Sequence, residues 1–175
     1  MKRIFLIIAA ICITSLMQAQ RTDPIDEFFD RYSERDGFTT VTISGKLLGL
    51  FAGKNENREG SDIINRLTSI KILSVDDSLM NNRINFYNEL RGKIDLSAYE
   101  ELMDVKEGKN TTKFLIKQKG DNISDLILIS GGPNGNTLIS IKGNLDLKSL
   151  SELSEGTGID ELKDLEKIDD QKRKQ

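Results

Sequence analysis

Four strand-like runs follow one another in the second half of the chain, and the short spacing between them constrains the fold more than any other feature. The runs are 99–106, 111–118, 123–130 and 137–143, and the turns between them are rich in Gly and Asn. Connections of three to six residues are too short for a crossover helix, so neighbouring strands must be antiparallel. The spacing therefore predicts a C-terminal four-stranded meander.

Helices and two more strands are predicted before this meander. Asp23 and Pro24 are typical of a helix start, and the apolar residues that follow recur at helical spacing. That spacing predicts a buried stripe made of Ile25, Phe28, Phe29 and Tyr32. The next expected elements are a strand over 38–43, a short helix from Ser44 to Gly53, a polar loop over 54–62 and a strand over 67–75. A helix is then expected from Asp77 or Ser78 to about Arg91, with Leu79, Phe86 and Leu90 as its buried stripe. A short helix is expected after Asp146. The predicted class is α+β, with two layers, a mostly antiparallel sheet and helices packed on one face.

The N-terminus has the pattern of a secretory signal peptide. Lys2 and Arg3 precede an apolar run from Ile4 to Met17, which is too short to span a bilayer as a helix, and a polar exit follows. We expect cleavage of residues 1–19, a single α+β domain over 20–154, and a charged tail over 155–175 that is flexible or helical. The expected location is the periplasm or the outer membrane and cell surface. Membrane association is expected only if the leader is retained.

The composition argues against several kinds of chemistry. The sequence has no His, and its one Cys, Cys12, lies in the segment expected to be removed. Triads of the Ser–His or Cys–His type and the usual zinc, haem and iron–sulfur ligands are therefore missing. The formal net charge of −3 disfavours nucleic acid as a partner. We predict no catalytic residues, no cofactor-binding residues, no metal ligands and no cofactor or nucleotide.

Several short motifs have a structural interpretation that we prefer to the chemical one. Ser44-Gly45-Lys46 is interpreted as a helix cap, and the Gly-rich stretch 131–136 as a hairpin turn, since no Gly-Lys-Ser/Thr follows it. The acidic pair Glu100-Glu101 lies on a strand, where adjacent side chains point to opposite faces, and Asp76-Asp77 precedes a helix. Asp77-Ser78-Leu79 resembles an O-glycosylation acceptor, but a helix cap is the preferred interpretation.

Four stretches of the chain are also similar to a known family. They are Asp36-Gly37-Phe38-Thr39-Thr40-Val41, Tyr99-Glu100-Glu101-Leu102-Met103, Lys113-Phe114-Leu115-Ile116-Lys117 and the stretch from Leu138 to Leu147. Together with the leader, they resemble the bacterial family catalogued as domain of unknown function 4252, found in exported proteins of Gram-negative bacteria. The likeness covers roughly Asp26 to Leu153 and implies a fold and export, with no catalytic or binding residue to transfer.

These observations favour a non-catalytic interaction or regulatory module of the cell envelope whose partner is another envelope protein. One alternative is a carrier of a small apolar ligand, because periodicity does not distinguish a filled core from a hollow one. The third is a carboxylate-dependent hydrolase, which would need two carboxyl groups about 5 to 10 Å apart and a raised pKa on one of them.

Overall fold

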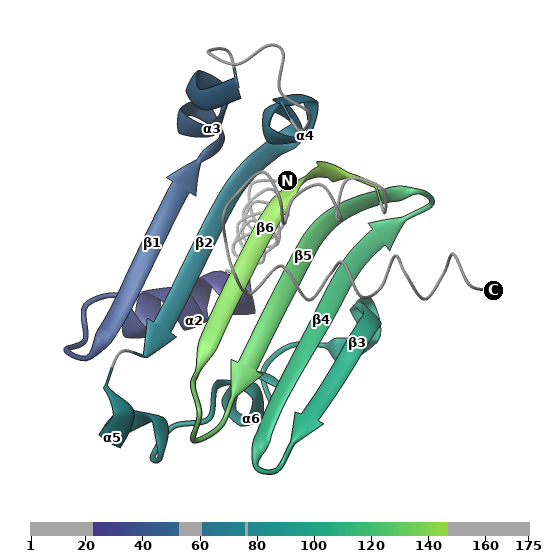
Figure 1. Ribbon diagram of the computed structural model, residues 1–175. Coiled ribbons are helices and arrows are strands. Elements are labelled where there is room, and N and C mark those ends of the chain that lie inside the picture. The colour runs from purple at the N-terminus through teal and green to yellow at the C-terminus, as the bar shows by residue number, and fades with distance from the viewer. Residues whose placement is uncertain (1–22, 53–60, 76, 147–175) are drawn as a thin grey trace, which may run out of the picture.

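The structure, a computed structural model, describes residues 23–52, 61–75 and 77–146. Its centre is a six-stranded sheet in the order β1-β2-β6-β5-β4-β3, in which every neighbouring pair is antiparallel (Figure 1). The strands are β1 (Phe38–Ser44), β2 (Leu67–Val75), β3 (Glu100–Glu107), β4 (Asn110–Lys119), β5 (Asn122–Gly131) and β6 (Thr137–Leu145). The predicted α+β class with a mostly antiparallel sheet is confirmed.

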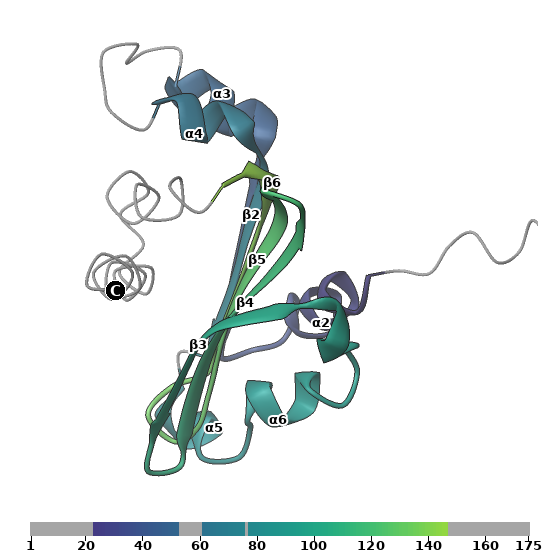
Figure 2. The same cartoon turned by 90° about the vertical axis from the view of Figure 1, so that its right-hand side faces the viewer.

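Short helices surround this sheet. They are α2 (Pro24–Tyr32), α3 (Gly45–Ala52), α4 (Ser61–Arg66), α5 (Ser78–Asn81) and α6 (Phe86–Leu90), and a 3-10 turn, η1, spans Leu96–Ala98. Figure 2 shows α2 and α6 on the same side of the sheet, which we call the helix side. In Figure 1, α3 and α4 lie at one end of the strands, and α5 lies at the other end.

The sheet separates two apolar clusters, one on each side. On the helix side, Leu115, Ile127 and Leu138 pack with the buried residues of α2 and α6. The opposite side, which we call the far side, carries the alternate residues of the same strands, such as Phe114, Leu128 and Ile139. Both faces of β5 are therefore apolar, as expected of a strand in the middle of a sheet, and β5 lies between β6 and β4.

The first helix agrees with its prediction. Asp23 is the N-cap, where its carboxylate accepts the N–H of Ile25 at 2.9 Å, and Pro24 is the first helical residue. All four residues of the predicted stripe are buried. Phe28 packs edge-on against Phe86 of α6, with 5.2 Å between the ring centroids. This contact fixes α2 and α6 next to each other on the helix side.

The predicted continuous helix from Asp77 or Ser78 to Arg91 is wrong. The chain instead forms α5 and α6, separated by residues 82–85. Asn85 has an extended backbone, and its side chain accepts the N–H of Asn88, so it begins a new helix and interrupts the old one. Leu79 belongs to no buried stripe and is 71% exposed. The helix α4 was not predicted either, since its first residues fall in the expected polar loop.

Several predictions concern residues outside the described ranges. These are the leader over 1–19, loop residues 54–60, Asp76, the helix after Asp146 and the tail over 155–175. Within the described ranges, no helix is long and apolar enough to cross a membrane.

Candidate functional site

A group of ion pairs joins the start of α2 to the helix side of the sheet. Lys142 of β6 donates hydrogen bonds to the carboxylates of Asp23 (2.8 Å) and Asp26 (3.1 Å). Lys71 of β2 donates to the other oxygen of Asp26 at 2.7 Å. We call these four residues the α2 anchor, because two lysines from neighbouring strands hold the two carboxylates at the helix N-terminus.

In the α2 anchor, the pKa shifts favour the charged forms of Asp26 and Lys142. Burial alone would raise the pKa of Asp26, but hydrogen bonds from Lys71 and Lys142 outweigh it and lower that pKa. Burial would likewise lower the pKa of Lys142, whereas its bonds to the two carboxylates raise it. A general acid or base works best with a pKa near the operating pH. Both shifts move away from neutrality, so the geometry suits anchoring better than proton transfer.

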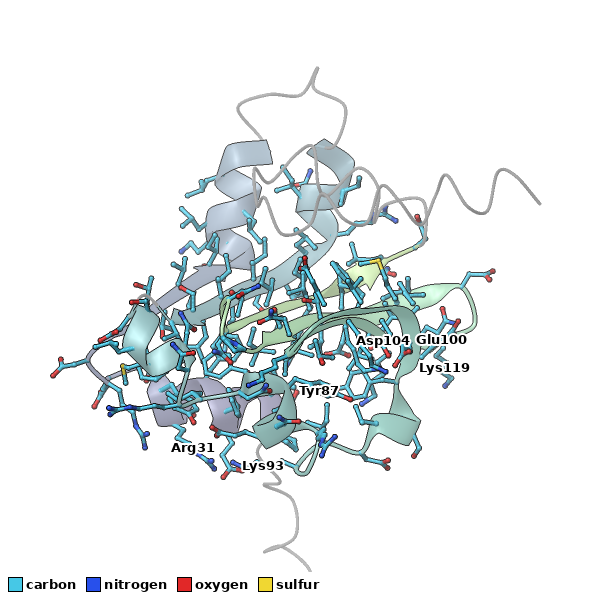
Figure 3. The ribbon with its side chains drawn as sticks, turned by 60° about the horizontal axis from the view of Figure 1, so that its bottom comes forward. Arg31, Tyr87, Lys93, Glu100, Asp104 and Lys119 are labelled. Atoms are coloured by element: carbon cyan, nitrogen blue, oxygen red, sulfur yellow. The ribbon has the colours of Figure 1, made fainter. Side chains whose placement is uncertain are left out.

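A second charged cluster lies between α6 and the β3–β4 hairpin. Lys113 of β4 is only 8% exposed, and its Nζ contacts the carboxylates of Glu101 and Asp104, the latter at 3.0 Å. The same Nζ lies 5.8 Å from the ring centroid of Tyr87 of α6 (Tyr87 and Asp104 are labelled in Figure 3). Burial would lower the pKa of Lys113, but hydrogen bonds to the two carboxylates raise it. This lysine is therefore protonated at neutral pH and unsuited to act as a nucleophile.

The two edge strands of the sheet differ sharply in charge. β3 has the sequence Glu-Glu-Leu-Met-Asp-Val-Lys-Glu, and its register with β4 shifts between Glu101 and Met103. Charged side chains and irregular register are the usual protection of an edge strand against further pairing. β1 has the sequence Phe-Thr-Thr-Val-Thr-Ile-Ser, without charge or proline, and it pairs with β2 without a shift from Phe38 to Ser44. The β1 edge therefore lacks these protections.

Exposed apolar side chains lie on and beside the β1 edge. Val41, in the middle of β1, is 39% exposed, and Leu50 of the following helix α3 is 61% exposed. Leu47 of α3 is exposed as well. Regular pairing, missing charge and exposed apolar residues together make β1 and α3 the candidate interaction surface, which we call the β1 surface.

The structural interpretations of four sequence motifs are confirmed. The Ser44 hydroxyl accepts the N–H of Leu47 at 3.4 Å, and the Asp77 carboxylate accepts the N–H of Leu79 at 2.7 Å, so both residues are helix caps. Residues 132–136 form the turn between β5 and β6. Glu100 accepts a hydrogen bond from Gln118 at 2.5 Å, whereas Glu101 contacts Lys113, so the two acids do not form one site.

No group of three or more potential metal-ligating side chains is found among the described residues. Neither the two charged clusters nor the β1 surface is predicted from the sequence. A lysine at position 71 or 142 inside an apolar strand is a signal for a half-buried charge, but its partners come from distant segments. The position of β1 at an edge depends on β2 pairing with β6, which no local pattern reveals.

The chain matches a known protein family. Residues 32–153 match the family described as Domain of unknown function (DUF4252), and this range covers most of the chain and all six strands of the sheet. No curated protein and no solved structure matches the chain.

Proposed function

The chain belongs to the DUF4252 family, and on that premise we propose that it is an exported, non-catalytic interaction or regulatory module of the bacterial cell envelope. In this proposal it binds a protein of the envelope through the β1 surface, by adding a partner strand to the sheet. The signal-peptide pattern of the N-terminus supports export, in the periplasm or at the outer membrane and cell surface.

One observation carries this proposal: β1 is an edge strand without a charged residue, while the opposite edge strand carries five. Natural proteins protect edges that must stay unpaired. Strand addition to an edge gives affinity through main-chain hydrogen bonds and specificity through alternate side chains. An unprotected β1 beside a protected β3 is therefore what a strand-binding module needs.

The finer expectations about the fold belong to this proposal. A C-terminal meander from β3 to β6 would make the charged β3 its outer strand, and a helix layer on one face would leave the β1 edge accessible from the side. The direction of the carboxyl pKa shifts supports a non-catalytic role, because each shifted carboxyl pKa in the described residues, at Asp26, Asp95 and Asp104, is lowered. A hydrolase of the carboxylate type would need at least one raised carboxyl pKa.

A carrier of a small apolar ligand is the second candidate. The far-side cluster favours it, because an apolar sheet face is suited to contact with an apolar ligand. The described members of this cluster come from the strands, except for Leu48 of α3 and Ile63 and Ile64 of α4. Native mass spectrometry of the protein purified from the envelope fraction would show a co-purified lipid-sized ligand if this alternative is right. Polypeptide mass alone would count against it.

Site-specific crosslinking in cells tests the proposed function. A photo-crosslinking residue replaces Val41 on β1 or, as a matched control, Val105 on β3, because the two valines are similarly exposed, at 39% and 43%. We expect an adduct with an envelope protein from position 41 and none from position 105. Adding Thr42→Lys should abolish the adduct, since a charge on the edge opposes strand addition. Equal adducts from both positions, or none from position 41, would overturn the proposal.

Cell fractionation tests the export part separately. The proposal expects the protein in the periplasmic or outer-membrane fraction, with an intact mass that lacks residues 1–19. A full-length protein in the cytoplasmic fraction would contradict it.

A further inference from the structure

We infer that the strand received by the β1 edge is β1 of a second copy of this chain, so that two molecules form a two-fold dimer with one continuous sheet. This inference rests on the proposed function of the β1 surface and names its partner. A two-fold axis makes such an interface self-complementary, because each strand is both donor and acceptor.

The sequence of β1 is suited to antiparallel pairing with itself. With Val41 opposite the partner's Val41, Thr40 lies opposite the partner's Thr42 and the reverse pair forms on the other side of the axis. Thr–Thr pairs on adjacent antiparallel strands are favourable. The length of β1, from Phe38 to Ser44, places Val41 at its centre, so this register pairs the whole strand.

Charge favours β1 over β3 for pairing between identical copies. The full chain carries a formal net charge of −3, so two copies repel each other weakly at long range. A β1–β1 contact places no charged strand residue opposite another. A β3–β3 contact would bring together two strands that each hold four acidic residues and one lysine. Like charges opposite each other destabilise strand pairs.

The dimer would also cover apolar surface. Val41 pairs with Ile72 of β2, whose side chain packs against the far-side cluster, so Val41 lies on the far side as well. Residues directly opposite each other on antiparallel strands point to the same side of the sheet. The far sides of the two copies would therefore be continuous, and each Val41 would be shielded by the partner's Val41.

Sedimentation and disulfide trapping of the purified protein test the inference. The full chain is expressed with Cys12→Ser, which removes the one native Cys, and purified from the envelope fraction. We expect a dimer by analytical ultracentrifugation. Val41→Cys should form an intermolecular disulfide under mild oxidation, because opposed residues on antiparallel strands are about 4.5–5.5 Å apart between Cα atoms. Val105→Cys on β3, where Val105 is similarly exposed, should remain reduced.

Two charge variants keep the test independent of one substitution. Val41→Lys and Thr42→Lys place a charge on opposite sides of β1, and each should weaken dimerisation by about tenfold or more while the far-UV circular dichroism stays unchanged. A monomer at about 100 μM without Val41→Cys trapping overturns the inference, as does a dimer that neither variant weakens. Crosslinks from position 41 to a different envelope protein, with a monomer in solution, would leave the proposed function intact. Absence of both crosslinks and dimer would overturn both.

Discussion

The phenolic oxygen of Tyr32 donates a 2.6 Å hydrogen bond to the carboxylate of Glu89 and so joins α2 to α6. The ring of Tyr32 also lies within 5.5 Å of the rings of Phe28, Phe38 and Phe86, measured between centroids. The α2 anchor fixes the start of this helix through ion pairs, and Tyr32 fixes its last turn through an aromatic cluster. The two attachments explain why a helix of only nine residues has a defined place on the sheet.

The hydrogen bond between Tyr32 and Glu89 can be tested by removing one oxygen atom. Tyr32→Phe keeps the ring packing and should lower the free energy of unfolding by about 1–2 kcal/mol, because the acceptor is charged and half-buried. Tyr87→Phe is the matched control, since the described contacts of Tyr87 involve its ring. Urea unfolding of both variants measures the difference. Equal losses would show that the Tyr32 bond contributes nothing specific.

Alkaline pH should destabilise the fold. Burial and the neighbouring Glu89 raise the pKa of Tyr32 to about 12, and burial with the charges of Asp23 and Asp125 raises that of Tyr99 to about 12. A raised pKa in the folded state contributes stability that is complete below the unfolded value of 10 and disappears as the pH rises through 12.

Urea unfolding at a series of pH values measures this loss. The free energy of unfolding should fall between pH 10 and pH 12. The lysines contribute with the same sign, because the pKa values of Lys113 and Lys142 are also raised. Tyr32→Phe should show a smaller fall than the unchanged protein. A stability that is constant over this interval would contradict the assignment of these shifts to the folded state.

A buried asparagine connects the β5–β6 turn to the helices α5 and α6. Asn136 is 1% exposed; its side-chain oxygen accepts the N–H of Phe86 at 2.9 Å, and its amide donates to the side chain of Asn81 at 2.9 Å. Asn136→Ala leaves the buried N–H of Phe86 without this acceptor and should cost about 1–3 kcal/mol. Thermal or urea unfolding measures this cost.

Asn134 provides the control for this substitution. It lies in the same turn with an exposed side chain, and the hydrogen bond recorded for it comes from its backbone N–H. Asn134→Ala should therefore change stability by less than about 0.5 kcal/mol. If the free energy of unfolding falls by the same amount in both variants, the turn as a whole is responsible for the loss and not the Asn136 side chain.

Local patterns predicted the elements whose determinants are close in sequence. The stripe of α2, the caps Asp23 and Asp77 and the four strands after residue 99 depend on neighbours within a few residues, and all were found. The break between α5 and α6 was missed, because the helical spacing of Leu79, Phe86 and Leu90 continues across it while Asn85 caps a new helix. At this position the hydrogen bond of the capping side chain begins a new helix, even though the apolar residues keep their helical spacing.

The candidate interaction surface depends on contacts that no local pattern encodes. Lys71 and Lys142 are adjacent only because β2 pairs with β6, and Asp26 reaches both from a third segment. β1 is an edge for the same reason. The sequence shows that β1 has no charged residue. This absence indicates an interaction surface only when the strand order shows that β1 is an edge strand.

The contact between the end of β5 and the start of α6 gives the last prediction. A Cβ on Gly131 would lie 2.5 Å from the side-chain oxygen of Asn85 and 2.7 Å from the backbone nitrogen of Tyr87. Asn85 caps α6, so Gly131→Ala would push the helix start away from the sheet and should destabilise the fold by about 1–3 kcal/mol.

Gly135→Ala is the matched control for the Gly131 substitution. Its Cβ would meet nothing within 4 Å, and the backbone φ of Gly135 is not positive. Alanine there should be neutral or stabilising by up to about 1 kcal/mol, because it reduces the freedom of the unfolded chain. Urea unfolding of the two variants should therefore give changes of opposite sign or of clearly different size. Equal changes would mean that α6 can move away from β5 at little cost, and that Gly131 is not required for their close approach.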